Sequence, residues 1–177
     1  MKHSSVTLLG SAALLGLFVA AAKSDHPLAS QRGFDVFPIG TVKKGEGRTT
    51  IVLDKKYQAG LSCVDEFSHV HVLYWLDRND SPEKRSILQV HPRGDKSNPL
   101  CGVFATRAPV RPNLIAMSLC KVVAVRENVV EIDRIDAFED TPVLDIKPYI
   151  HSTDAAEARH PEWISHEPEP HHRCSRR

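Results

Sequence analysis

Residues 102–125 read GVFATRAPVRPNLIAMSLCKVVAV, and they carry most of the information about the fold. Residues 114–125 are apolar at nearly every position, with one serine and one lysine, which is typical of a strand buried on both faces. In the first half, Pro109 and Pro112 fix their own φ angles and push the residues before them toward extended conformations. The sequence therefore predicts a stiff, non-helical loop that leads into a long strand central to a β-barrel.

Shorter strands are expected on both sides of this stretch. They alternate with Gly-, Pro- and Asn-containing turns, and residues 57–67 between two of them are irregular or briefly helical. The expected strands cover residues 36–42, 49–53, 68–76, 86–90, 101–106, 128–134 and 142–149. Because the chain of 177 residues is long enough for one core, we predict a mainly β fold: a small single-domain β-barrel with short helical or irregular segments.

The two ends of the chain differ from this domain. Residues 1–22 place an uncharged apolar run after Lys2 and end it in small residues, which is the layout of a signal-peptide-like helix. The segment is a cleaved signal peptide, an uncleaved anchor, or an extension from a start site assigned too far upstream. The first two imply export or membrane anchoring, and the third a cytoplasmic protein. Residues 23–35 form a linker, 36–150 the barrel domain and 151–177 a loose C-terminal tail.

The charge balance limits how the chain could bind a nucleic acid. There are 23 Lys and Arg against 22 Asp and Glu, so the formal net charge is +1. Non-specific affinity for nucleic acids depends on contacts between basic side chains and phosphates. Any RNA contact must therefore use a local patch, such as Arg107, Arg111 and Lys121.

The cysteines and histidines suggest no metal centre. Cys63, Cys101, Cys120 and Cys174 lack the close spacing of a zinc site. A disulfide between Cys101 and Cys120, on consecutive expected strands, and buried reduced thiols are equally compatible with the sequence. His69 and the histidine two residues later share one strand face, but a packing or pocket role is the simpler interpretation, and no metal ligand is predicted.

Four blocks of sequence resemble a known family. Residues 102–113 are similar to the signature of the TsaA-like, TrmO-type family of S-adenosylmethionine-dependent tRNA (adenine-N6) methyltransferases. The blocks PIGTV at 38–42, FSHVHVLYW at 67–75 and TPVLDIKPY at 141–149 resemble other family blocks in the same order. The resemblance covers roughly residues 36–150.

The resemblance implies a compact β-barrel with S-adenosylmethionine as cofactor and tRNA as partner if the protein is cytoplasmic. It also implies a homodimer with the donor pocket near the boundary between protomers. The implied activity is methyl transfer to the exocyclic amine of a modified adenosine beside the anticodon. Two alternative hypotheses remain. The chain is an exported, non-catalytic module that binds a nucleoside or another small molecule, or it is a structural domain stabilised by disulfides.

The resemblance also assigns residues to the donor pocket. Arg107 matches the first arginine of the signature and would bind the polar end of S-adenosylmethionine, since guanidinium groups pair well with carboxylates. Met117 would line the adenine pocket. Glu139, Asp140 and Thr141 stand where the family has an Asp-Gly-Thr turn at the pocket rim.

Other residues are candidates for the substrate side. Arg111 and Asn113 could face the substrate, and Asn113 is also a candidate catalytic residue. Asp136 or Asp145 could accept a hydrogen bond from the amine that receives the methyl group. From spacing alone, Asn113 is equally a turn former and Asp145 an ion-pair partner of the following lysine.

The chain departs from the family pattern in three places. Residues 43–48, KKGEGR, replace a longer loop that often bears Pro-Arg-Gln and contributes to the donor pocket. Leu114–Ala116 replace Pro-Ile-Gly. Asp140 replaces the glycine of the rim turn, and aspartate adopts left-handed backbone at some cost.

Overall fold

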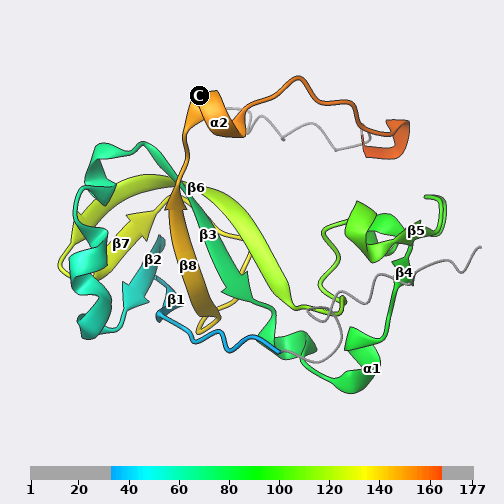
Figure 1. The fold of residues 1–177 in the computed structure, drawn as a ribbon, viewed down its shortest axis with the longest axis horizontal. Coiled ribbons are helices and arrows are strands. Elements are labelled where there is room, and N and C mark those ends of the chain that lie inside the picture. Colours follow the sequence, from blue (N-terminus) through cyan, green and yellow to red (C-terminus); the bar gives the residue numbers. More distant parts are fainter. Residues whose placement is uncertain (1–32, 165–177) are drawn as a thin grey trace, which may run out of the picture. The chain divides into compact units, whose positions relative to one another are not determined.

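The structure, a computed structural model, describes residues 33–164. The chain divides into Met1–Asp35 and Val36–Arg177, and the fold below belongs to the second unit. Six antiparallel strands close into a barrel in the order β1-β2-β7-β6-β3-β8, so the predicted mainly β barrel is confirmed (Figure 1). The strands are β1 Gly40–Gly45, β2 Arg48–Leu53, β3 His69–Trp75, β6 Ile115–Arg126, β7 Val129–Ile132 and β8 Pro142–Pro148.

Strand β6 is the longest and pairs on both edges. It runs antiparallel to β3 from Trp75↔Ile115 to His69↔Lys121, and its second half pairs with β7. The long central strand predicted for residues 114–125 is therefore present. Its outward face, however, is left uncovered by the described residues: Ile115, Met117, Leu119 and Val123 are all exposed.

The barrel closes where β1 meets both β2 and β8. Gly40 pairs with Leu53 on one side and with Val143 on the other. A Cβ added to Gly40 would collide with the carbonyl oxygen of Val52 and lie 2.7 Å from the Cα of Leu53. Because these neighbours are backbone atoms that cannot rotate away, only glycine fits at this closure point.

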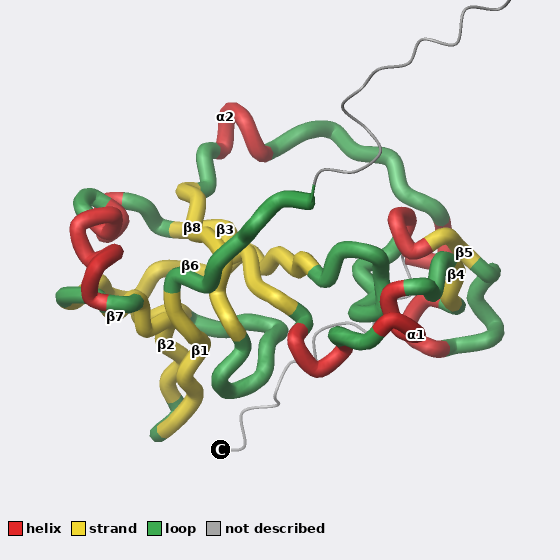
Figure 2. The backbone as a smooth tube through the Cα atoms, turned by 60° about the horizontal axis from the view of Figure 1, so that its bottom comes forward, coloured by secondary structure: helices red, strands yellow, loops and turns green. Residues whose placement is uncertain are grey.

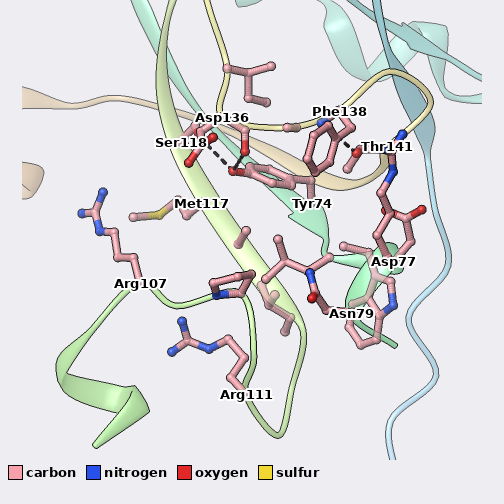
Figure 3. A pocket seen from close by; sticks show the side chains of 18 of the residues that line it. Tyr74, Asp77, Asn79, Arg107, Arg111, Met117, Ser118, Asp136, Phe138 and Thr141 are labelled. Atoms are coloured by element: carbon pink, nitrogen blue, oxygen red, sulfur yellow. Dashed lines mark hydrogen bonds between the residues drawn. The ribbon is translucent and has the colours of Figure 1, made fainter. Parts of the chain in front are cut away.

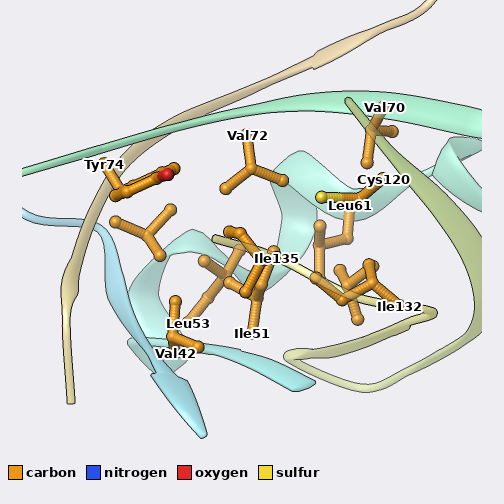
Figure 4. Packing of buried hydrophobic residues seen from close by; sticks show 12 residues of the cluster. Val42, Ile51, Leu53, Leu61, Val70, Val72, Tyr74, Cys120, Ile132 and Ile135 are labelled. Carbon is orange, nitrogen blue, oxygen red and sulfur yellow. The ribbon is translucent and has the colours of Figure 1, made fainter. Parts of the chain in front are cut away.

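The core fills the barrel interior with alternate residues of each strand (Figure 4). On β3 the inward residues are Val70, Val72 and Tyr74, each almost fully buried. Ile51 and Val72 have no exposed surface, and burying such a side chain contributes about 1.5–3 kcal/mol. The alternation of β3 is thus set by the barrel interior.

The connection from β3 to β6 consists of loops and short turns (Figure 2). A two-stranded sheet, β4 with β5, is the only regular pairing among the described residues of this connection. Its elements are the 3-10 turn Asp77–Asn79, α1 Pro82–Arg85, β4 Gln89–Val90, the turn Pro92–Gly94, β5 Cys101–Gly102 and the turn Val103–Ala105. Elsewhere lie the 3-10 helices Lys55–Leu61, Val64–Glu66 and Glu162–Ile164, and α2 His151–Asp154.

Three predicted strands have wrong bounds. The strand expected at residues 86–90 begins only at Gln89. The strand expected at residues 36–42 begins only at Gly40, since Val36 and Phe37 are exposed and Pro38 has no N–H for a ladder. The strand expected at 101–106 ends at Gly102. There the backbone N–H and the hydroxyl of Thr106 both donate to the carbonyl of Val103, which closes a 3-10 turn instead.

The cysteines of the described region carry free thiols. Cys101 lies in the two-stranded sheet and Cys120 inside the barrel, so the disulfide considered between them is absent. Cys120 is fully buried, and burial raises the pKa of its thiol to about 12. It therefore behaves as a small core residue.

The predictions for residues 1–22, for nearly all of the linker and for the end of the tail lie outside the described residues. Within residues 33–164, no helix is long and apolar enough to cross a membrane. The tail expected from residue 151 contains α2 and the short turn at Glu162–Ile164 before the description ends.

Candidate functional site

A cavity of about 1170 Å³ lies at the end of the barrel where β3 finishes and β6 begins. Three segments that are far apart in the sequence surround it: the turn after β3, the proline-rich loop before β6, and the connection from β7 to β8. Figure 3 shows Arg107 and Arg111 on one side, Phe138 and Thr141 on the opposite side, and Tyr74 between them. Three of the four family-like blocks of the sequence thus contribute to one site.

The proline-rich loop presents the two arginines to this cavity. Arg107, Pro109 and Arg111 all line it. The prolines restrict the backbone of this loop, so both arginines are presented on the same side. Neither arginine forms an ion pair within the part of the chain that the structure describes. The loop therefore offers two uncompensated planar cations to a ligand with a carboxylate or phosphate.

A set of side chains from the β3–α1 region fixes the loop to the barrel. Arg85 donates to the backbone carbonyl of Pro112 at 3.0 Å, and its other nitrogens bind the carboxylate of Asp80 at 2.8 and 3.1 Å. The indole N–H of Trp75 donates to the same carboxylate at 3.1 Å. These hydrogen bonds, from Arg85 first and from Trp75 second, lower the pKa of Asp80. The loop is thus tied to β3 through one carboxylate.

The floor of the cavity is a hydroxyl pair. Tyr74 of β3 donates a short hydrogen bond to the backbone carbonyl of Asp136 and lies 3.2 Å from the hydroxyl of Ser118 on β6. Burial raises the pKa of Tyr74, and the positive charge of Arg107 acts weakly in the opposite direction. The phenol therefore stays protonated and anchors the segment that carries Asp136.

Sequence reasoning missed Tyr74 and Ser118 as site residues. The signal available was their alternation: Tyr74 shares a face with Val70 and Val72, and Ser118 is the one hydroxyl within the apolar run of 114–125. Their meeting depends on the register Tyr74↔Ala116 and Val72↔Ser118, which only the folded barrel provides.

The far rim is built by the β7–β8 connection. Thr141 is buried, and its hydroxyl accepts from the backbone N–H of Phe138 at 3.2 Å. Arg78 lies over the ring of Phe138, 4.1 Å from its centroid. Asp140 has φ 65°, so the rim turn keeps the left-handed residue that a glycine would supply without strain.

The predicted site residues divide into two groups. Arg107, Arg111, Met117, Asp136 and Thr141 line the cavity together. Four others lie outside its lining: Asn113, Glu139, Asp140 and Asp145.

Each of the outlying acids has another partner. Asp140 and Glu139 face β1. The carboxylate of Asp140 pairs with Lys43 and raises the pKa of that lysine, and the carboxylate of Glu139 accepts a hydrogen bond from the backbone N–H of Lys44. Asp145 forms an ion pair with Lys147 at 2.8 Å and lines a different cavity of about 510 Å³. These contacts separate the three carboxylates from the barrel-end cavity.

The residues that line the cavity suit the functional groups of S-adenosylmethionine. Arg107 and Arg111 suit a carboxylate, whereas Met117, Ile115 and Ala116 offer an apolar wall to an adenine. Oxygen atoms of Asp136, Tyr74 and Ser118 lie on the floor. Their partial negative charge would suit the positively charged sulfonium.

Comparison with known proteins gives consistent results. Residues 31–155 match the family model of the tRNA-methyltransferase O N-terminal domain. A probable S-adenosyl-L-methionine-binding protein of Methanocaldococcus jannaschii is 45% identical over 117 residues, which are 66% of this chain and 93% of that protein. The rat tRNA (adenine(37)-N6)-methyltransferase is 38% identical over 108 residues, 60% of this chain but only 24% of the rat protein.

A solved structure shares the fold. The crystal structure of TrmO from Pseudomonas aeruginosa matches with a TM-score of 0.60 and 27% identity over 80% of this chain and 66% of that one. The family predicted from the four sequence blocks is confirmed, and the predicted cofactor is the ligand in the name of the archaeal relative.

Proposed function

The chain belongs to the family of the tRNA-methyltransferase O N-terminal domain, and from this membership and the cavity we propose that it is an S-adenosylmethionine-dependent tRNA methyltransferase. Its substrate is the exocyclic amine of a modified adenosine beside the anticodon. One observation carries the proposal: the rigid loop places Arg107 and Arg111 in the lining of a cavity with an apolar wall and an oxygen-lined floor.

The residues act mainly by positioning. When bound, S-adenosylmethionine supplies an activated methyl group. Arg107 would hold its carboxylate, and Met117 would pack against its adenine. Because transfer from a sulfonium to an amine is an in-line displacement, the rate depends on alignment and on exclusion of water rather than on strong acid–base groups.

The substrate amine needs orientation more than deprotonation. Asp136 is the carboxylate of the cavity lining best placed to accept a hydrogen bond from the amine, because Tyr74 fixes its backbone. Arg111 and Asn113 lie at the loop and would contact the RNA. An adenosine in an unstacked anticodon loop is accessible to such a site without opening a duplex.

We also propose that the protein works as a homodimer. The outward face of β6 exposes Ile115, Met117, Leu119 and Val123, an apolar stripe on a strand that continues into the cavity wall. A second copy on this stripe would place the donor pocket near the boundary between protomers. Light scattering should show a dimer that Val123→Glu dissociates, whereas Val36→Glu, at the same 56% exposure but outside the barrel, leaves it intact.

Calorimetry tests the donor site directly. Titration of the full chain with S-adenosylmethionine should give saturable binding. Loss of one charge-assisted hydrogen bond costs about 1.5–3 kcal/mol, so Arg107→Ala should weaken binding by about 10- to 150-fold. Arg48→Ala is the control, because Arg48 lies on the β1–β2 hairpin and pairs with Glu46. Absence of any binding heat would refute the donor site.

Turnover is tested with a radiolabelled methyl donor and a synthetic anticodon stem–loop RNA that carries the modified adenosine. At a donor concentration below saturation, label should enter the RNA with the native chain and much more slowly with Arg107→Ala. Donor binding without any label transfer would instead support the second candidate below.

One observation favours that second candidate, a non-catalytic module that binds a nucleoside-like ligand. The β1–β2 turn is only two residues long, Glu46 and Gly47, so the family's longer loop is missing. Among the described residues, none of β1 or β2 lines the cavity. An exported form would meet neither tRNA nor the donor, and cell fractionation with mass spectrometry of the N-terminus decides between export and a cytoplasmic location.

A further inference from the structure

A second hollow adjoins the donor cavity on the other side of the proline-rich loop. It has a volume of about 1170 Å³ and is formed largely by β4, the turn Pro92–Gly94 and residues 104–110. Thr106, Arg107 and Pro109 line both hollows, so one short wall separates them. A ligand larger than the methyl donor could therefore occupy both sides of this wall at once.

An exposed aromatic ring stands in the second hollow. Phe104 is 79% exposed although it lines the cavity. The turn that carries it is well anchored: Val103 before it is buried, its N–H donates to the carbonyl of Leu88 at 2.9 Å, and Thr106 bonds back to it. The ring is thus held outward on a fixed base rather than on a free loop.

The charge around this ring is positive. Lys96 and Arg107 contribute positively charged groups to the lining, and no described residue of the lining is acidic. The nearest carboxylate in sequence, Asp95, is turned to the backbone N–H and hydroxyl of Ser97 at 2.9 and 2.8 Å. Lys96 forms no ion pair within residues 33–164. This local excess stands out in a chain whose formal net charge is only +1.

We propose that this second hollow, named here the Phe104 platform (Phe104, Lys96 and Arg107), binds an unstacked nucleotide of the RNA beside the methylated base. The base stacks on Phe104, and its phosphate pairs with Lys96, whereas Arg107 in the shared wall holds the carboxylate of S-adenosylmethionine. An aromatic ring among basic side chains suits single-stranded RNA because every base has a face for stacking and every nucleotide carries a phosphate. The inference rests on the proposed function, since it concerns how that site holds its RNA.

The two kinds of contact leave different signatures in a binding experiment. Stacking of one base is lost in Phe104→Ala, which should weaken binding about tenfold and leave its salt dependence unchanged. Lys96→Ala removes a phosphate contact, so the slope of log K against log salt should fall by about 0.7. Neither substitution should alter the affinity for S-adenosylmethionine, because neither side chain lines the donor cavity.

The assay is fluorescence anisotropy of the full-length variants with a labelled anticodon stem–loop RNA at several salt concentrations, beside calorimetry with S-adenosylmethionine. Phe37→Ala and Lys56→Ala are the matched controls. Phe37 is 70% exposed and Lys56 is an exposed lysine, and both lie outside the two hollows. Circular dichroism confirms that each variant is folded.

The outcomes separate this inference from the proposed function. Native affinity for RNA in both Phe104→Ala and Lys96→Ala would overturn the platform while leaving donor binding and methyl transfer untouched. Equal weakening with a fully paired RNA duplex would also overturn it, because a duplex offers no free base. A change of oligomeric mass in Phe104→Ala would show that the ring contacts a second copy instead. Failure of the native chain to bind the RNA at all would overturn both proposals.

Discussion

The hydroxyl of Tyr74 gives the sharpest test of how the barrel supports its cavity. Tyr74→Phe removes one oxygen and leaves the ring, which is 3% exposed, in the same packing. The lost contacts are the hydrogen bond to the carbonyl of Asp136 and the 3.2 Å contact with Ser118. The first of these joins residues 62 positions apart in the sequence.

The expected loss follows from these two contacts. Each intramolecular hydrogen bond contributes about 0.5–1.5 kcal/mol, and Ser118 can rotate its hydroxyl to find another partner. We therefore expect Tyr74→Phe to lower the free energy of unfolding by about 1–2 kcal/mol. Affinity for S-adenosylmethionine should fall several-fold, because the segment that carries Asp136 is no longer tied to β3.

The effect should also depend on pH in a defined direction. Burial raises the pKa of Tyr74 above its ordinary value of 10.0. A group whose pKa is raised by folding stabilises the protein fully below the unfolded pKa and loses that contribution as pH rises through the folded value. The difference in unfolding free energy between native chain and Tyr74→Phe should be constant up to about pH 10 and shrink above it.

Urea denaturation followed by circular dichroism measures these differences. Tyr57→Phe is the matched control, since the described residues offer no hydrogen-bond partner to the Tyr57 hydroxyl, and it should change stability by less than about 0.5 kcal/mol. The reasoning fails if Tyr74→Phe unfolds at the native midpoint, or if both substitutions cost the same.

Two further substitutions test the barrel itself. Gly40→Ala should lower the free energy of unfolding by about 1–3 kcal/mol because its Cβ meets backbone atoms of β2, whereas Gly60→Ala, with open space around it, should cost nothing; equal midpoints in urea would contradict this. Cys120, with its pKa raised by burial to about 12, should resist alkylation at pH 8 while exposed Cys63 reacts, as mapped by mass spectrometry. Because unfolding returns the Cys120 pKa toward 9.0, its contribution to stability should be complete below pH 9 and decline from pH 9 to 12, a decline that should be missing in Cys120→Ala.

The sequence predicted the barrel well because apolar residues at every second position of a strand all point to the same side, which in a closed barrel is the interior. In β3, Val70, Val72 and Tyr74 alternate with polar or outward residues, and the structure buries all three. The long apolar run of 114–125 was also correctly placed as the central strand. The prediction that this strand is buried on both faces was wrong, since its outward face is exposed. A sequence alone does not distinguish apolar residues that fill a core from apolar residues that lie on the surface.

The local sequence pattern predicts the part of the site that one loop carries, whereas Met117 and Thr141 were assigned to the site by the family resemblance. Arg107 and Arg111 sit on a proline-braced segment, and the two prolines alone imply that both side chains are presented together. Asp145 shows the limit of such reasoning. Its register opposite Leu73, next to a bulge between Leu73 and Tyr74, places it on the outer surface of the barrel beside Lys147. No local pattern reveals that register.

The short β1–β2 turn, the open cavity and the apolar stripe of β6 are connected. Methyl transfer requires a site that excludes water, and this cavity receives no wall from β1 or β2 among the described residues. Ile115, Met117 and Leu119 line the cavity and also belong to the exposed stripe. A second copy bound to the stripe would therefore cover the donor as well as the strand. Because coupling between two binding events is reciprocal, donor binding and self-association should each strengthen the other by the same factor.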